Sequence, residues 1–270
     1  MKLAAVFNIW EDSIELFPYA VLNMPADEFI FVWSNRSNRG GEPADRDYWD
    51  FTKPRRMDAG GLGRQWKYVA FNASMFHYVQ CEPENFSAPH ESETRKRNVG
   101  LDKAKELGCT HFIICDSDEF YDKLSLQWTK KEIDRKNLNG VVHPIRVYVG
   151  KPTLWCDDHT LVPGIQKLES NTELGIFKRY PFAYDAQGNA HIDPTRRTNA
   201  TSGIEMSPYT MHHMSYVRRD IDLKIRNSSA NLRRSEAAIK RDIANAAPGY
   251  MSELYHRELK ECENLFNITI

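Results

Sequence analysis

Two aspartates separated by one residue follow an apolar run near the middle of the chain. Asp116 and Asp118 come directly after residues 112–115, which have the character of a strand buried on both faces. Two carboxylates at the end of such a strand can turn toward one hard cation. A Mg²⁺ or Mn²⁺ ion held in this way completes its shell with phosphate oxygens and water, and it can neutralise a leaving diphosphate. The spacing therefore predicts a metal site, although an acidic turn after a strand has the same pattern.

An arginine lies on the apolar face of the helix expected just before this strand. In residues 93–107, Arg97, Leu101 and Ala104 occur at spacings that place them on one face. A buried arginine requires an anion. Two partners satisfy that need, namely a bound diphosphate or an internal carboxylate such as Asp116.

The elements that must position these residues read as an α/β fold. Residues 3–8 and 29–33 are apolar runs typical of buried strands, and a helix over 14–22 separates them. A β-α-β opening indicates a parallel sheet, whose ligands bind outside the carboxyl ends of the strands. Further strands are expected over 75–81, 110–115 and 140–149, an irregular region over 151–201, and helices from 220, over 235–246 and over 251–266.

Composition sets broad limits. The chain has 270 residues, 41% of them hydrophobic, which suits one large domain or one domain with a small appendage. A net charge of -1 argues neither for nor against a polyanionic partner, but residues 216–241 are locally basic and read either as a solvated helical face or as an anion-binding surface. Five cysteines without metal-type spacing indicate reduced thiols, so a cytoplasmic location is expected. No apolar run approaches the roughly 20 residues of a membrane span, so no membrane insertion is expected.

The segment from Arg97 to Leu101, followed by Ala104 and by residues 112–119, resembles the nucleotide-sugar half of GT-A fold glycosyltransferases, especially family-2-like members. Residues 6–12 resemble the first strand and loop of that fold. The resemblance implies a Rossmann-type mixed sheet flanked by helices, with a helical C-terminal region. It also implies a catalytic domain over 1–215, with a nucleotide-sugar half over 1–125 and an acceptor half over 126–215, and an extension over 216–270 packed on it.

The same resemblance implies a set of site residues. Residues 211–218 are similar to a late His-x-Ser segment whose histidine returns to the metal or the diphosphate, which we assign to His213 rather than His212. Adjacent histidines on a strand point to opposite faces, so at most one of them faces a given site. The implied metal ligands are Asp116, Asp118 and His213, and the implied nucleotide-binding residues are Phe7, Asn8, Trp10, Arg97, Asp116 and Ser117.

The implied activity is transfer of a sugar from a nucleotide diphosphate sugar, with a UDP-sugar as the expected donor, to an acceptor hydroxyl with Mn²⁺ or Mg²⁺. An inverting reaction needs a carboxylate base, for which Asp193 is favoured over Asp157, Asp158 and Glu173 because it lies in a polar loop shortly before His213. A retaining reaction needs no such base.

Residues 192–197 and 224–229 also resemble glycosyltransferases of large tailed bacteriophages. Some of those enzymes modify hydroxymethylated bases of the phage's own DNA. That likeness implies modified double-stranded DNA as an acceptor and the host cytoplasm as the location.

Three alternatives stand beside this prediction. A saccharide- or lipid-directed glycosyltransferase would share the fold. A nucleotidyltransferase would share the sheet and the acidic metal site, but residues 8–13 lack the glycine-rich loop that usually holds a triphosphate. A non-catalytic nucleic-acid-binding module is disfavoured by the near-neutral net charge.

Overall fold

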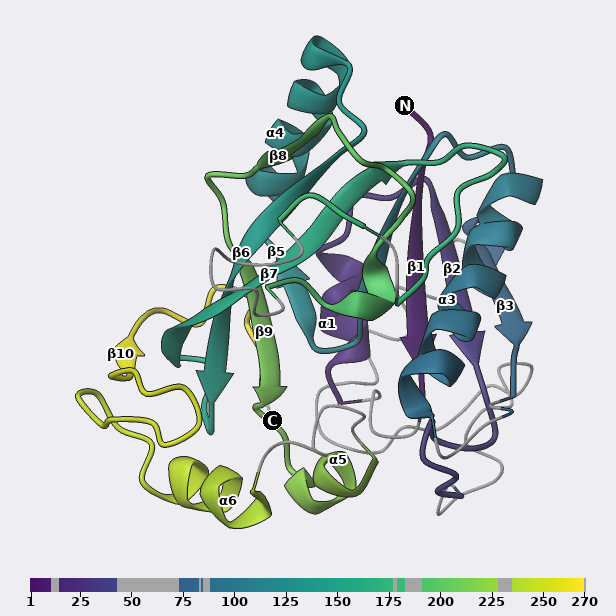
Figure 1. Cartoon of the computed structure of the whole chain (residues 1–270). Coiled ribbons are helices and arrows are strands. Elements are labelled where there is room, and N and C mark those ends of the chain that lie inside the picture. The colour runs from purple at the N-terminus through teal and green to yellow at the C-terminus, as the bar shows by residue number, and fades with distance from the viewer. Residues whose placement is uncertain are drawn as a thin grey trace.

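A computed structural model describes residues 1–10, 15–42, 73–82, 84, 88–176, 179–182, 191–227 and 235–269. The central strands of this structure are parallel. β1 (Leu3–Ile9) lies between β2 (Glu28–Trp33) and β4 (His111–Asp116), and β3 (Phe76–Gln80) extends the sheet beyond β2 (Figure 1). The four strands expected in the first half of the chain are therefore confirmed.

Two helices cover opposite faces of these strands. α1 (Phe17–Leu22) belongs to the core that contains Phe7 and Phe31, whereas α3 (Pro89–Glu106) contributes Leu101 and Ala104 to the core on the other face. Both helices carry proline in the first turn, where the missing N–H has no intrahelical partner to lose. For this reason Pro18 is compatible with α1, and α3 begins at Pro89, earlier than expected. Asp12, a candidate N-cap for the helix expected over 14–22, lies outside the described residues.

Antiparallel and parallel strands that follow β4 in the chain continue the sheet. They are β5 (Glu119–Tyr121), β6 (Gly140–Val149), β7 (Leu154–Lys167), β8 (Ile204–Met206) and β9 (Met211–Tyr216). α4 (Lys123–Lys136) contacts β6 and β7, and η3 (Ala73–Met75) and η4 (Pro194–Arg196) are short 3-10 turns. The described residues thus form one ten-stranded mixed sheet in the order β3-β2-β1-β4-β7-β6-β9-β5, with β10 beside β7 and β8 beside β6. This mixed α/β sheet flanked by helices is the fold class that the sequence predicted.

The prediction of an irregular region over 151–201 was wrong for its first part. β7 runs through residues 157–160, Asp-Asp-His-Thr, which interrupt the apolar alternation of a strand. Long-range pairing outweighs this local pattern, because β7 pairs with β6 along most of its length and with β4 and β10 at its ends.

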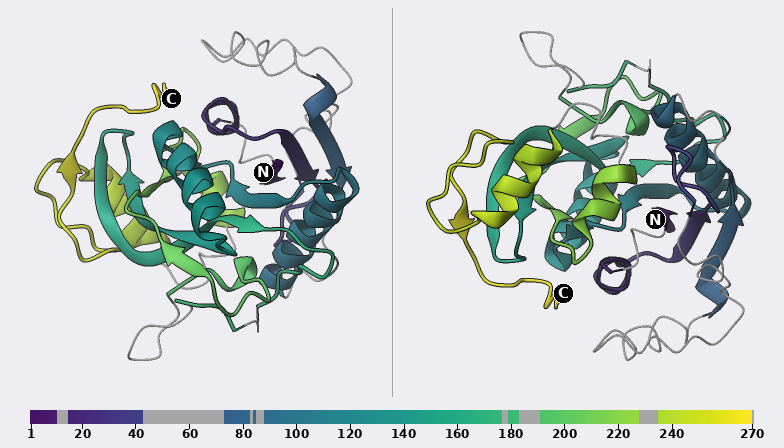
Figure 2. Two further views of the ribbon diagram at one scale, coloured as in Figure 1. Left: turned by 90° about the horizontal axis from the view of Figure 1, so that it is seen from above. Right: turned by 90° about the horizontal axis from the view of Figure 1, so that it is seen from below.

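The C-terminal region contains two of the three expected helices, α5 (Ile221–Asn227) and α6 (Glu236–Ala244). The helix expected over 251–266 is absent from the structure, which has turns there and the two-residue β10 (Lys260–Glu261). The buried carboxylate of Asp242 accepts hydrogen bonds from the Ser252 hydroxyl and from the backbone N–H groups of Glu253 and Leu254. These bonds hold the chain in turns. Figure 2 shows this C-terminal segment and α3 on opposite sides of the molecule.

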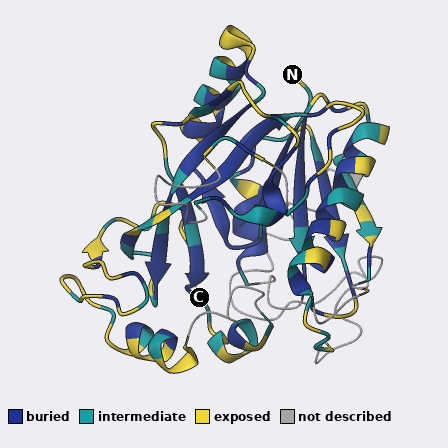
Figure 3. Ribbon diagram, viewed as in Figure 1, coloured by how far each residue is buried: buried dark blue, intermediate teal, exposed yellow. Residues whose placement is uncertain are grey.

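Burial is concentrated in the sheet, as Figure 3 shows, and the outer faces of the helices are exposed. The motif glycine Gly100 permits α3 to approach the sheet closely, because a Cβ at this position would collide with the Val6 side chain of β1 and contact Val32 of β2. Among the described helices, none is both long and apolar enough to cross a membrane.

Acidification is expected to destabilise the fold through His143, which lies fully buried on β6. Burial lowers its pKa from 6.5 to about 4, although a hydrogen bond to the Tyr209 carbonyl opposes that shift. Between these pKa values the unfolded chain binds a proton that the folded chain does not. The contribution of neutral His143 to the free energy of unfolding is therefore fully present above about pH 6.5. Up to about 3 kcal/mol of it is lost as the pH falls to about 4.

Urea denaturation between about pH 7.5 and pH 4.5 would measure this loss of stability. His143→Gln removes the titrating group and keeps a donor for the Tyr209 carbonyl, so its stability should depend less on pH. A parallel decline in wild type and variant would contradict the assignment to His143.

Candidate functional site

The acidic segment lies where the strand order of the parallel sheet reverses. From β1 the chain adds β2 and then β3 on one side, and β4 on the other. The carboxyl ends of β1 and β4 therefore border the crevice in which open α/β sheets bind ligands. Asn8 and Asp116 are register partners at this position. The side-chain amide atoms of Asn8 are buried and make no hydrogen bond with any residue that the structure describes, so a ligand would supply the missing partners.

Arg97 is fully buried and bonded to carboxylates. One terminal nitrogen donates to Asp116 (3.1 and 3.2 Å) and to Glu93 (2.7 Å), and the other donates to Asp193 (3.2 Å) and to the Thr195 hydroxyl. Of the two partners expected for this arginine, the internal carboxylate is therefore present. With both terminal nitrogens occupied and no exposed surface, Arg97 acts on a ligand through Asp116 and Asp193.

A second buried arginine, Arg196 of η4, completes the network. It donates to both oxygens of Glu119 at 2.7 Å and to Asp116 at 2.7 Å, and its Nε lies 3.2 Å from Asp193. Glu119 is itself buried, and burial raises its pKa to about 7 although Arg196 opposes that shift. The two arginines fix the positions of Asp116 and Asp193, whose side chains stay 32% and 35% exposed.

Asp193, the predicted base, lies in this network. Burial alone would raise the pKa of its carboxyl group, but Arg97 and Arg196 outweigh burial and hold the pKa well below its usual range. The carboxylate also accepts hydrogen bonds from the backbone N–H and hydroxyl of Thr195. Asp193 is thus a permanently ionised group and a weaker base than an ordinary aspartate.

Asp118 belongs to a separate, cationic group. One of its carboxylate oxygens, Oδ2, accepts from Arg218 at 2.5 Å and from Lys224 at 3.0 Å. The other oxygen, Oδ1, lies 3.7 Å from Nε2 of His213. Burial opposes ionisation of this carboxylate, but Lys224 and Arg218 outweigh burial and hold its pKa well below the usual range.

The two adjacent histidines of β9 face opposite sides, as the strand geometry predicts. His213 faces Asp118, and burial lowers its pKa although Asp118 opposes that shift, so the imidazole is neutral at about pH 7. His212 instead shares a hydrogen bond of 2.8 Å between its Nδ1 and the Tyr148 hydroxyl, and its ring packs against Phe266.

The donors fit a divalent cation in part. A carboxylate oxygen and a neutral imidazole nitrogen 3.7 Å apart are compatible with one shared cation that takes its remaining ligands from phosphate and water. Both oxygens of Asp116 are instead engaged by the arginines. In the part of the chain that the structure describes, no group of three or more His, Cys, Asp or Glu side chains is arranged for a metal. The pair Asp118–His213 is therefore the better candidate, with Asp116 outside it.

The remaining predicted nucleotide-binding residues are largely buried. The Phe7 ring packs against Phe17 and Phe31 in the core, so only its backbone is available to a ligand. Trp10 is also in the core with 7% exposure, and Ser117 is 3% exposed. Asn8 differs from Phe7 in that its side-chain amide atoms, although buried, have no hydrogen-bond partner among the described residues.

Sequence reasoning missed Arg196, Glu119 and the site role of Lys224. A usable signal existed for Arg196, because two arginines directly follow Asp193-Pro194-Thr195, and a proline-initiated turn brings basic and acidic side chains together. Lys224 had no comparable local signal, because it lies in the basic stretch 216–241 among several similar residues.

Four basic residues in the described part of that stretch are paired with acids. Lys240 contacts Asp222 and Glu236, and Arg241 contacts Glu253. With Arg218 and Lys224 committed to Asp118, these contacts weaken the expectation that the stretch binds a nucleic-acid backbone.

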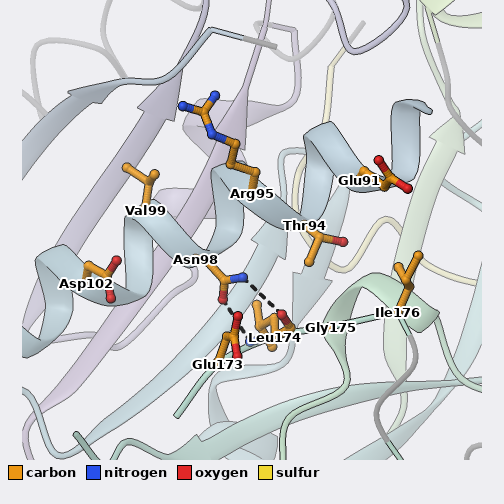
Figure 4. Close-up of a pocket in the computed structure, with 10 residues that line it drawn as sticks. All are labelled: Glu91, Thr94, Arg95, Asn98, Val99, Asp102, Glu173, Leu174, Gly175 and Ile176. Atoms are coloured by element: carbon orange, nitrogen blue, oxygen red, sulfur yellow. Dashed lines mark hydrogen bonds between the residues drawn. The ribbon is translucent and has the colours of Figure 1, made fainter. Parts of the chain in front are cut away.

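The outer face of α3 lines an open groove with residues 173–176, separate from the acidic site (Figure 4). Asn98 bridges this groove with its side chain. Its Nδ2 donates a hydrogen bond to the Leu174 carbonyl at 3.0 Å, and its Oδ1 accepts one from the Leu174 N–H at 2.8 Å. The motif asparagine therefore anchors the segment after β7 to α3.

No protein-family model and no curated protein matches the sequence. Among solved structures, the chain is similar to S. aureus TarS 1-349, with a TM-score of 0.41 and 16% identity over 90% of this chain and 70% of that one. The same TarS region in complex with UDP-GlcNAc gives a TM-score of 0.39 and 15% identity over 91% and 72% of the two chains. A 4-diphosphocytidyl-2C-methyl-D-erythritol synthase gives 0.30 and 12% over 79% and 75%. All three TM-scores lie below 0.5, so the assignment of a function depends on the side chains of the acidic site.

Proposed function

We propose that this chain is a metal-dependent glycosyltransferase that moves a sugar from a nucleotide diphosphate sugar to an acceptor hydroxyl. One observation carries the proposal. At the carboxyl ends of β1 and β4, two fixed and partly exposed carboxylates, Asp116 and Asp193, are joined through residues 116–119 to the Asp118–His213 pair and its two cations. Within one site, this arrangement offers carboxylates that accept hydrogen bonds from hydroxyl groups, and positive charge that can bind a diphosphate.

Each group has a proposed role. Asn8 would contact the nucleotide with its amide, which has no hydrogen-bond partner in the part of the chain that the structure describes. Asp116 and Asp193 would accept hydrogen bonds from hydroxyl groups of the donor and acceptor, with Arg97 and Arg196 holding them in place. For an inverting reaction, Asp193 is the proposed base. Mn²⁺ or Mg²⁺, when bound, would be held by Asp118 and His213 and would stabilise negative charge on the leaving diphosphate.

The proposed donor is a UDP-sugar. Four of the basic residues in the described part of 216–241 are paired with acids, which weakens the support that this stretch gives to a DNA acceptor. A hydroxymethylated base in duplex DNA is therefore one acceptor to test beside saccharides and lipids.

A panel of nucleotide sugars, scored by release of the nucleoside diphosphate with Mn²⁺ present, tests the proposal. We expect release from at least one sugar nucleotide, and a loss of about 100-fold in Asp118→Asn and in His213→Gln because each removes one proposed ligand of the metal. Asp102→Asn on the exposed side of α3 is the matched control and should behave as wild type.

His213→Gln leaves the buried Arg218–Asp118 ion pair in place, so it separates loss of a metal ligand from loss of folding. Absence of both binding and release across the panel would refute the transferase proposal. Full activity of both site variants would refute the metal site.

A further inference from the structure

Arg146 is a half-buried cation that forms no ion pair with any residue that the structure describes. It lies on β6, which pairs with β7 on one side and with β9 on the other, so its backbone is fixed from both sides. Its Nε is buried and makes no hydrogen bond with the described residues. Buried donors of folded proteins are nearly always paired, so this guanidinium group has a hydrogen-bonding capacity that the described residues leave unused.

An indole ring holds the guanidinium group in place. Cζ of Arg146 lies 4.1 Å from the centroid of the Trp155 ring, and Nζ of Lys260 lies 5.0 Å from the same centroid. Lys260 comes from β10, where it is the register partner of Trp155. A guanidinium group that stacks on an aromatic ring uses its flat face for the contact and keeps its edge for hydrogen bonds. Two cations therefore lie beside one ring, and the edge of one of them is free to donate.

One carboxylate accompanies these two cations. Asp157 is the register partner of Arg146 on β7, but its Oδ2 forms its ion pair with Lys260, at 3.6 Å. The side chains of Lys260 and Asp157 are 56% and 59% exposed, and an exposed pair of this kind contributes little free energy. Lys260 can thus turn toward an incoming anion at small cost, and Arg146 has no such pair to break.

The group lies on the face of the sheet opposite to the Asp118–His213 pair. Arg146 is the register partner of His212, and register partners on neighbouring strands project from the same face. Tyr148, two residues along β6 from Arg146, shares a hydrogen bond with His212 and so confirms this face. His213 projects from the other face, toward Asp118. A diphosphate bound beside Asp118 and His213 therefore does not satisfy Arg146.

We propose that Arg146, Trp155 and Lys260 form a binding site for a phosphate monoester, in which Arg146 donates two hydrogen bonds to phosphate oxygens and Lys260 supplies a second positive charge. The guanidinium fork matches the spacing of phosphate oxygens, and a doubly charged phosphate suits two cations better than a singly charged carboxylate does. Trp155 orients the fork before the ligand arrives, which lowers the entropic cost of binding. None of these residues belongs to the proposed transfer site, so the phosphate site is independent of the proposed function.

Titration with inorganic phosphate, at constant ionic strength and with EDTA present, tests the site. The indole N–H signal of Trp155 in the NMR spectrum, assigned by its absence in Trp155→Phe, should shift and saturate in the wild type. Arg146→Met should weaken phosphate binding by about 10- to 100-fold because it removes the charge-assisted hydrogen bonds, and Arg146→Lys should fall between the two. Arg135→Met is the matched control, because Arg135 is paired with Glu132 and 63% exposed on α4, and it should bind phosphate as the wild type does.

The indole signals of the other tryptophans report whether each variant is folded. Lys260→Met changes an exposed position and should weaken phosphate binding by about 3- to 10-fold, which keeps the test valid if Arg146→Met fails to fold. A wild type that shows no saturable shift, or a shift that Arg146→Met and Lys260→Met leave unchanged, would overturn the site. Acetate that binds as tightly as phosphate would overturn the assignment to a phosphate group.

Discussion

Replacing Arg196 with methionine is expected to lower the free energy of unfolding by about 3–5 kcal/mol. The guanidinium group is 2% exposed and contacts Glu119, Asp116 and Asp193. Its removal leaves Glu119 buried without its bidentate partner. Among the described arginines, Asp116 and Asp193 would then contact Arg97 alone. Urea denaturation at about pH 7 would measure the loss.

A surface arginine provides the control. Arg135 on α4 pairs with Glu132 but is 63% exposed, so Arg135→Met should cost less than about 1 kcal/mol. Adding Glu119→Gln to Arg196→Met removes the buried carboxylate left unpaired and should recover part of the stability. If Arg196→Met and Arg135→Met prove equally stable, the buried network does not stabilise the fold in the way its geometry indicates.

Mn²⁺ and UDP are expected to bind cooperatively, each raising the affinity of the other by about 10- to 100-fold. The proposed ligands Asp118 and His213 lie beside Arg218 and Lys224, which repel a bare divalent cation. A diphosphate cancels this repulsion and supplies oxygen ligands to the metal. Calorimetry with the two ligands added in either order would give both affinities, which linkage requires to change by the same factor.

The charge of Lys224 is the origin of this expected coupling. In Lys224→Met, Mn²⁺ alone should bind more tightly than in wild type, and the coupling with UDP should be smaller. Equal Mn²⁺ affinity with and without UDP in the wild type would contradict the electrostatic account of the site.

The motif that carried the family resemblance has a local structural explanation. Arg97 holds the carboxylates, Asn98 anchors Leu174, Gly100 permits close packing on Val6, and Leu101 lies in the core. These roles follow from helical periodicity and from adjacency to the next strand, so an inward-facing Arg97 and an acidic strand end could be predicted from short stretches of sequence. The same periodicity failed over 251–266, where the buried carboxylate of Asp242 organises turns instead.

By itself, the sequence determined the parallel half of the sheet, the position of Asp116 and Asp118 at a strand end, and the opposite orientations of His212 and His213. These features depend on residues that are neighbours in the chain. Only the tertiary structure decided which charges meet: Arg196 reaches Asp116 across 80 residues, and Lys224 reaches Asp118 across 106. A basic residue looks the same in sequence whether it pairs with a distant carboxylate or with water, because its partner is selected by strand order and burial. The fold thereby pairs Asp116 with Arg97 and Arg196, and Asp118 with Arg218 and Lys224.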